Sequence, residues 1–458
     1  MLAFGAVYPW AYWPLAGAAA LVGLGGLLAG SGRPWHERPL ALALLLVATA
    51  AALQTVPLPR GVLEAISPAT LRYLESYDLR WAYGLVPTDS HAISLNPAKT
   101  WLAIALLTAF TLLLLGTARL VALAGSARLC GGLIVLGTVV ALIAIIQDAL
   151  TSHLLAYDVK IYGFWQPQNR ATPYGPFVNR NHYAGWILMV VPLAIGSLAG
   201  LLEHGFRRVR PTLRDRLLWM GSPAGGRAWL LLLSIAVMTL SLLLSESRSG
   251  PAAFAIAVTV TGVVVLPGSR PWLRAVAALG LALLLVAAVA IWAGSDTGLA
   301  RFSSVSTEIG ARLSAWSDAL SIVRAFPIFG TGLNTYGAAS LLYQSTSLTS
   351  HYREAHNDYL QLAAEGGLLL GLPILLGLWQ LVRLIGSRFA APDPDRVRYW
   401  IRVGATTGLL GIAIQSLVEF SLQMPGNAAL FAVLAGIALH PGARPNPDSG
   451  SQPGPNHA

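Results

Sequence analysis

The sequence has few charged residues and almost no cysteine. Asp, Glu, Lys and Arg make up 11% of its 458 residues, whereas a soluble domain carries about 25%. The single cysteine, Cys130, lies in an apolar run, so an intrachain disulfide and a zinc site built on cysteines are both excluded. These scarcities exclude an ordinary soluble protein, a disordered chain and a disulfide scaffold.

Long apolar runs dominate the sequence instead. Hydrophobic residues make up 55% of the chain, and the mean hydropathy is +0.62. An apolar run of about 17–25 residues can cross a bilayer as a helix. The sequence therefore predicts an all-α, polytopic membrane protein with eleven spans, at residues 12–30, 37–54, 100–117, 128–147, 183–202, 228–245, 251–267, 274–293, 360–382, 402–419 and 427–441.

Three long polar stretches interrupt these runs, and they suggest a division of the chain. The C-terminal tail is rich in Pro, Gly and Ser, a composition typical of disorder. The predicted parts are N-terminal transmembrane helices at 1–293 with outer loops at 55–99 and 148–182, a large periplasmic loop with short helices at 294–359, C-terminal transmembrane helices at 360–441, and a disordered cytoplasmic tail at 442–458.

The net charge of +10 comes from arginines spread through short loops, so a nucleic-acid partner is not expected. Basic loops of membrane proteins favour the cytoplasm, which orients the chain by its loops 203–227 and 383–402. All three polar stretches then face the outside, the periplasm in a Gram-negative cell. In this orientation the N-terminus also lies outside, and we expect that a helix upstream of Met1 is missing from the sequence.

Two clusters of polar residues lie where spans begin or end on the outer side. Asn179, Arg180 and His182 fall at the start of the fifth span, where Asn179 can cap the helix and Arg180 can bind an anion. The alternative is an interfacial arginine beside a cap. Arg248 lies in the tight turn Ser-Glu-Ser-Arg-Ser-Gly (245–250), where a pair with Glu246 that closes the turn is the alternative to function.

A third cluster surrounds His356, in the segment 351–361 that is followed by Glu365-Gly-Gly. A histidine titrates near neutral pH and can act as a base or an acid. A structural histidine is the alternative. A metal site built on His351, His356 and Asp358 is disfavoured, because their spacing matches no standard site.

Taken together and in this order, these motifs resemble the O-antigen ligase/polymerase family of bacterial membrane glycosyltransferases. The most specific is His-Asn-Asp-Tyr-Leu with Glu365-Gly-Gly after it. The resembling segments are spread over most of the chain and are LQTVPLP (53–59), FVNRNHYAG (177–185), SESRSG (245–250), RLSAWSDAL (312–320), FPIFGTGLNTYG (326–337), HNDYLQLAAEGGLLLG (356–371) and SLVEFSLQMPGNAALFAVLAG (416–436).

The resemblance implies a fold of about twelve spans, each of about 20 residues, with one large periplasmic loop. It also implies a donor glycan carried on undecaprenyl diphosphate. The acceptor would be a hydroxyl of the lipid A core or of another saccharide, at the outer face of the bacterial inner membrane. The family needs no metal, nucleotide sugar or other cofactor, and none is expected here.

By their positions in the family motifs, Arg180 and Arg248 are expected to stabilise the leaving diphosphate. His356 is the expected base for the acceptor hydroxyl, and attack opposite the diphosphate would invert the anomeric centre. Glu419 stands where some relatives carry Asp, and its role stays open. The further substrate-binding residues expected are Arg312, Asn179, His182, Asn357 and Tyr336.

The sequence leaves several alternatives open. It does not separate a ligase from an O-antigen or exopolysaccharide polymerase of the same family. A polysaccharide or lipid transporter is a different class, but transporters often show internal repeats and polar residues near the bilayer midplane. This sequence has no evident repeat, and its notable ionisable groups gather at the outer face. A non-catalytic assembly subunit is the third alternative.

Overall fold

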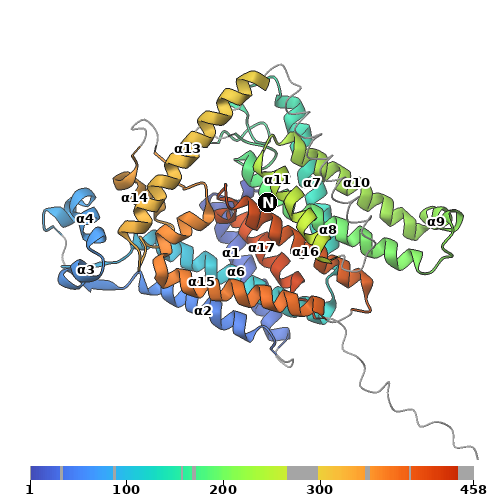
Figure 1. Cartoon of the computed structure of the whole chain (residues 1–458), viewed down its shortest axis with the longest axis horizontal. Coiled ribbons are helices and arrows are strands. Elements are labelled where there is room, and N and C mark those ends of the chain that lie inside the picture. The colour runs from blue at the N-terminus through green and yellow to red at the C-terminus, as the bar shows by residue number, and fades with distance from the viewer. Residues whose placement is uncertain are drawn as a thin grey trace, which may run out of the picture.

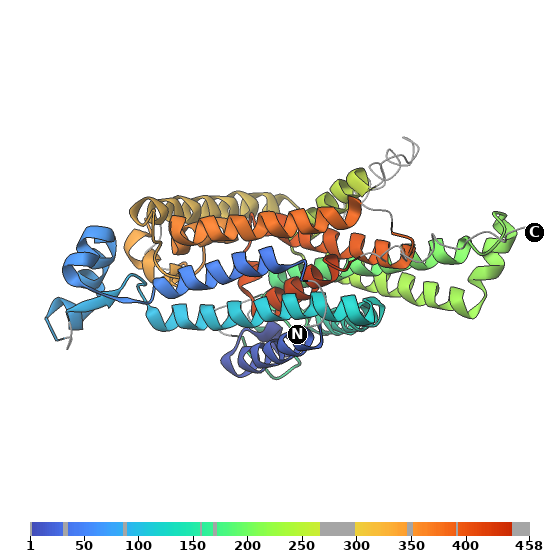
Figure 2. The same ribbon diagram turned by 90° about the horizontal axis from the view of Figure 1, so that it is seen from below.

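The computed structural model of the chain describes residues 2–30, 35–85, 89–155, 158–167, 172–265, 298–345, 351–390 and 393–441. Long helices dominate this part of the chain and are gathered in one bundle (Figures 1 and 2). In chain order the elements are η1 (Phe4–Ala6), α1 (Pro9–Ala29), α2 (Arg38–Leu53), β1 (Pro57–Pro59), α3 (Arg60–Ile66), α4 (Pro68–Tyr77), α5 (Leu79–Ala82), β2 (Ser90–Ala92), α6 (Pro97–Ala124), α7 (Ala127–Thr151), α8 (Arg180–Phe206), α9 (Leu213–Met220), α10 (Pro223–Leu244), α11 (Ser249–Val265), α13 (Gly298–Ala325), α14 (Tyr336–Tyr343), α15 (Asp358–Ala390), α16 (Arg396–Gln415), η3 (Ser421–Gln423) and α17 (Pro425–Ala438).

The predicted all-α, multi-pass membrane fold is confirmed. Among the described residues, six helices are long and apolar enough to cross a membrane, namely α1, α6, α7, α8, α10 and α15. The shorter apolar helices are α2, α11 and α17. Each predicted span coincides with a helix except 274–293, which lies outside the described residues. The number of spans therefore stays a prediction.

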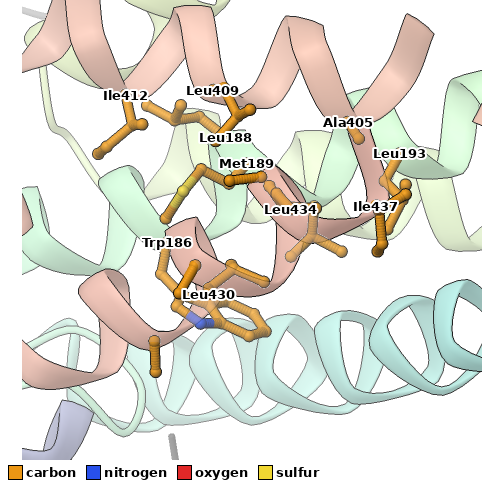
Figure 3. Close-up of a cluster of buried hydrophobic side chains, with 14 of the residues drawn as sticks. Trp186, Leu188, Met189, Leu193, Ala405, Leu409, Ile412, Leu430, Leu434 and Ile437 are labelled. Carbon is orange, nitrogen blue, oxygen red and sulfur yellow. The ribbon is translucent and has the colours of Figure 1, made fainter. Parts of the chain in front are cut away.

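The core that positions the site is the contact between α8, α16 and α17. Side chains from all three helices interdigitate there (Figure 3). Two glycines allow α8 and α16 to approach closely. A Cβ atom at Gly404 would lie 2.4 Å from the carbonyl oxygen of Pro192, and one at Gly196 would lie 2.2 Å from that of Trp400. Small residues at such crossings let membrane helices pack backbone to backbone, and this packing fixes the ends of α8 and α16.

Helix α15 is broken near its start, and a neighbouring segment accepts the hydrogen bonds that the break leaves unpaired. Gly367 has a φ of 54°, outside the helical region. The N–H groups of Leu368 and Leu369 donate to the carbonyls of Pro327 and Ile328, at 3.0 and 2.8 Å. A broken helix is tolerated in a membrane protein when neighbouring groups satisfy its backbone. The first turns of α15 are thus tied to the chain that follows α13.

Two of the predicted polar stretches hold regular structure. Within 55–99, β1 and β2 form an antiparallel ribbon beside α3, α4 and α5, a small β element that the all-α prediction did not include. This lobe and α9 lie at opposite ends of the molecule (Figures 1 and 2). Within 294–359, α14 is short, but α13 runs for 28 residues, longer than the helices predicted there.

Candidate active site

The first turn of α8 presents the first motif. Asn179 precedes the helix in an extended conformation, and its side-chain oxygen accepts a 2.8 Å hydrogen bond from the N–H of Asn181. Asn179 therefore caps α8, as the sequence predicted. The cap places Arg180 as the first helical residue, where the positive end of the helix dipole favours an anion.

Arg180 contacts the second motif. Its Nη1 atom donates to Oε2 of Glu246 at 2.9 Å, and both side chains are partly exposed. Glu246 has a φ of 54°, which is uncommon for a residue with a side chain. Arg248 lies two residues further on and is exposed in the same turn between α10 and α11. The turn that carries Arg248 is thereby joined to the start of α8 by an ion pair.

A buried carboxylate, Glu419, joins the other segments. Its side chain is 1% exposed. Its Oε1 atom accepts hydrogen bonds from Nη2 of Arg312 at 2.7 Å and from Nδ2 of Asn181 at 2.8 Å. Burying a charge is costly unless it is paired and hydrogen-bonded. Glu419 therefore holds α13, the start of α8 and the segment after α16 in one arrangement.

His356 lies over the second oxygen of this carboxylate. Its Nδ1 atom is 3.8 Å from Oε2 of Glu419, a distance for electrostatic attraction rather than a hydrogen bond. The Nδ1 atom is buried, while the side chain as a whole is 32% exposed. The exposed surface therefore belongs to the rest of the side chain, the part that can meet a substrate. A φ of 50° at His356 sets this direction just before α15 begins.

Phe420 separates two histidines of the site. Its ring meets the ring of His356 edge to face at 4.9 Å and that of His182 at 4.6 Å. His182 is buried, and its carbonyl oxygen accepts a hydrogen bond from Asn427 at 3.0 Å. His182 thus anchors α8 against α17, and its predicted contact with substrate stays a prediction.

Asn357 and Tyr336 also have defined structural places. The side-chain oxygen of Asn357 accepts hydrogen bonds from the N–H groups of Tyr359 and Leu360, both at 3.0 Å, and so caps α15. Tyr336 is buried among apolar side chains at the start of α14. Their predicted substrate contacts stay predictions.

Glu365 of the third motif organises the loop before α14. Its Oε2 atom accepts the N–H of Asn334 at 2.8 Å, and its Oε1 atom accepts the N–H of Tyr336 at 2.9 Å. Gln54, from the end of α2, donates to the carbonyl of Glu365 at 2.8 Å and accepts the N–H of Leu333 at 3.1 Å. Gln54 therefore joins the end of α2 to the loop before α14 and to the first turns of α15.

Glu354 adds a second carboxyl close to His356 in sequence. Burial raises the pKa of this carboxyl above its ordinary value, against the opposing attraction of His356, Arg353 and Lys99.

Asn181 and Glu419 were not among the predicted site residues, although both lie in the quoted motifs. The signal that points to Glu419 is an acidic residue inside an otherwise apolar segment, where ionisable groups are expensive.

The metal alternative gains no support from the geometry. Within the described parts of the chain, His351, His356 and Asp358 included, no three His, Cys, Asp or Glu side chains are grouped so that they could hold a metal ion. The arrangement presents instead an imidazole over a buried carboxylate that is hydrogen-bonded to Arg312. Such a set of groups can accept a proton and attract an anion.

Comparison with known proteins supports the family resemblance found in the sequence. The chain has no match among curated proteins. Residues 233–375, which run from within α10 to within α15, match the family model described as O-antigen ligase. The matched segment includes Arg248, Arg312 and His356. The match covers less than half of the chain, and it supports the resemblance to the O-antigen ligase/polymerase family.

Proposed function

We propose that this protein is a membrane glycosyltransferase of the O-antigen ligase type. It transfers a glycan from undecaprenyl diphosphate to a hydroxyl of the lipid A core or of another saccharide. The site lies at the end of the bundle that carries Arg180, His356 and Glu419, which we assign to the periplasmic face of the inner membrane. The observation that carries the proposal is His356, partly exposed above the buried carboxylate of Glu419.

The reaction is one displacement. The oxygen of the acceptor hydroxyl bonds to the anomeric carbon of the donor, while the bond from that carbon to the diphosphate oxygen breaks. The hydroxyl proton moves to Nε2 of His356, and the electron pair of the broken bond leaves with the diphosphate. Attack from the side opposite the leaving group inverts the anomeric centre.

Glu419 supports the proton transfer without touching the substrate. As His356 accepts the proton, its ring becomes a cation, and the carboxylate 3.8 Å from Nδ1 stabilises it. A buried carboxylate behind a catalytic imidazole serves the same purpose in serine proteases. Arg312, hydrogen-bonded to the other oxygen, holds that carboxylate in place.

Arg180 and Arg248 are the cations for the diphosphate. Arginine stays charged and matches phosphate oxygens with its planar fork. Arg180 has the additional favourable field of the α8 N-terminus. Fixed positive charge where negative charge develops is commonly a large part of catalysis. This chemistry needs no metal ion.

The test uses purified protein in lipid with undecaprenyl-diphosphate-linked glycan, alone and with a lipid A-core acceptor. Product that requires the core acceptor indicates a ligase, whereas polymer ladders from the donor alone indicate a polymerase. His356→Ala should abolish transfer, and His351→Ala, at an exposed histidine five residues earlier, should not. Normal transfer by a folded His356→Ala variant would disprove the proposed mechanism.

A further inference from the structure

The short helix α9 lies at the end of the molecule away from His356. It connects the end of α8 at Phe206 to the start of α10 at Pro223, and α8 begins at the site with Arg180. Figures 1 and 2 show α9 projecting beyond the neighbouring helices of the bundle. Helix α9 therefore lies at the membrane face opposite to that of the proposed transfer reaction.

The residues in and around α9 cap its N-terminus and attach it to the end of α8. Thr212 caps it, accepting the N–H of Asp215 at 3.2 Å and donating to the carboxylate of Asp215 at 2.8 Å. One side of the helix is anchored by Trp219, whose ring meets that of Phe206 edge to face at 5.3 Å. A Cβ atom at Gly205 would lie 2.2 Å from the Trp219 ring, so glycine is needed for this contact.

Another side of α9 exposes apolar side chains. Leu213, Leu217 and Leu218 are 74%, 62% and 65% exposed. Successive residues of a helix are about 100° apart, so Leu213, Leu217 and Met220 form one stripe. Arg214 and Arg216 flank this stripe on its two sides, and Asp215 lies opposite it. An apolar stripe between basic side chains is typical of helices that lie in a membrane surface.

The length of α10 places α9 at that surface. Helix α10 has 22 residues, long enough at about 1.5 Å per residue to cross a hydrocarbon core of about 30 Å. Its apolar run begins after Arg227, so Pro223 would lie about one turn outside that core, at the level of the headgroups, and α9 ends three residues before it. The exposed leucines of α9 would then lie at the membrane surface, within reach of the acyl chains.

The charge around α9 indicates which lipids it meets. The segment 203–227 has only two acidic residues. Glu203 is paired with Arg207 and Arg396, and Asp215 is engaged in the cap. The exposed arginines of the segment are Arg207, Arg208, Arg210, Arg214, Arg216 and Arg227. Clusters of this kind attract anionic headgroups.

We propose that α9 and these arginines bind the anionic phospholipid headgroups of the leaflet at the Pro223 end, with Leu213 and Leu217 inserted between the acyl chains. The arginines would neutralise the headgroups while the leucine stripe leaves water. Trp219 would keep the helix attached to α8, so that the lipid contact fixes the depth of α8 in the bilayer.

The single cysteine gives a direct test. Cys130 is buried, so Leu217→Cys in a Cys130→Ser background accepts one spin label. The labelled full-length protein is placed in nanodiscs of phosphatidylcholine with and without phosphatidylglycerol. The measurement compares how often the label collides with oxygen, which concentrates in lipid, and with a nickel complex, which stays in water. We expect phosphatidylglycerol to raise the ratio of oxygen collisions to nickel collisions several-fold. A label at Ser76→Cys, at the exposed surface of α4, is the aqueous reference.

A second measurement counts bound lipid. Native mass spectrometry of the wild type should retain phosphatidylglycerol, and Arg214→Gln with Arg216→Gln should lose it several-fold. The matched control changes two exposed arginines at the other end, Arg60→Gln with Arg72→Gln, and should retain the lipid.

Some results would overturn the proposal. One is a Leu217 label as water-exposed as the Ser76 reference in both membranes, as expected if α9 binds a soluble protein. Spin–spin broadening at Leu217 would indicate a second copy of the chain instead. Neither measurement depends on glycan transfer, so their failure and that of the proposed function are distinguishable.

Discussion

The Oε2 atom of Glu419 and the Nδ1 atom of His356 lie 3.8 Å apart, and both are buried. In the part of the chain that the structure describes, neither atom has a hydrogen-bond partner. The carboxylate is therefore placed to respond to the charge on the ring. This relationship leads to the first prediction.

Glu419→Gln should reduce transfer without unfolding the protein. The amide keeps an oxygen for Arg312 and Asn181 but removes the negative charge that stabilises protonated His356. We expect kcat to fall by about 10- to 100-fold, a part of the roughly 10²–10⁴-fold that a general base supplies. KM for the donor should change little, since Glu419 does not touch the diphosphate in the proposed reaction. Steady-state kinetics in lipid nanodiscs give both quantities.

The control for this prediction is Glu419→Asp, which restores the charge on a shorter side chain. It should recover part of the lost kcat. A Gln variant that turns over at the wild-type rate would show that the carboxylate has only a structural role.

Long-range convergence explains why Glu419 was not predicted as a site residue. Apolar run lengths gave the helices, because a bilayer of fixed thickness demands them. Arg180 and His356 stood out because ionisable groups beside spans are expensive. However, the contact of Glu419 with Arg312 and Asn181 joins three segments that are distant in sequence. No local spacing rule relates them, and they meet only through tertiary packing, of α8 on α16 and of α13 on α15.

An ion pair of Glu246 with a residue outside its own turn illustrates the same limit. The sequence suggested a pair between Glu246 and Arg248, which are close neighbours. The structure pairs Glu246 with Arg180 at 2.9 Å. The left-handed backbone at Glu246 sets the direction of its side chain, and local rules assign that conformation chiefly to glycine.

Glu246→Gln should strengthen donor binding. The carboxylate of Glu246 occupies Arg180, one of the two cations proposed for the diphosphate, so donor and carboxylate compete. An exposed ion pair is worth about 0–1 kcal/mol, so KM for the donor should fall by at most about fivefold, with kcat nearly unchanged. The matched control is Glu75→Gln, which breaks another exposed pair, with Arg60 at 2.6 Å. A higher KM in the Glu246 variant would mean that Glu246 positions Arg180 instead.

Glu354 should make stability depend on pH. Burial raises the pKa of its carboxyl above the ordinary value of 4.5, so the native state holds this proton more tightly than the unfolded chain does. The native protein is then favoured below about pH 4.5, and this contribution is lost as the pH rises through the native pKa. Glu354→Gln removes this pH dependence. The unfolding midpoint of the variant, relative to that of the wild type, should therefore increase as the pH rises. A constant difference between the two proteins across the titration would contradict the assignment.

Gly404→Ala should separate α8 from α16. The added methyl group would lie 2.4 Å from the carbonyl oxygen of Pro192, and overpacking of this kind costs about 1–3 kcal/mol. The unfolding midpoint in nanodiscs should fall, and kcat should fall with it, because the end of α16 leads directly to Glu419. Gly371→Ala is the control, since a Cβ atom there meets no neighbour within 4 Å and alanine favours the helix over glycine. Equal midpoints for the two variants would mean that the glycine contact does not hold the two helices together.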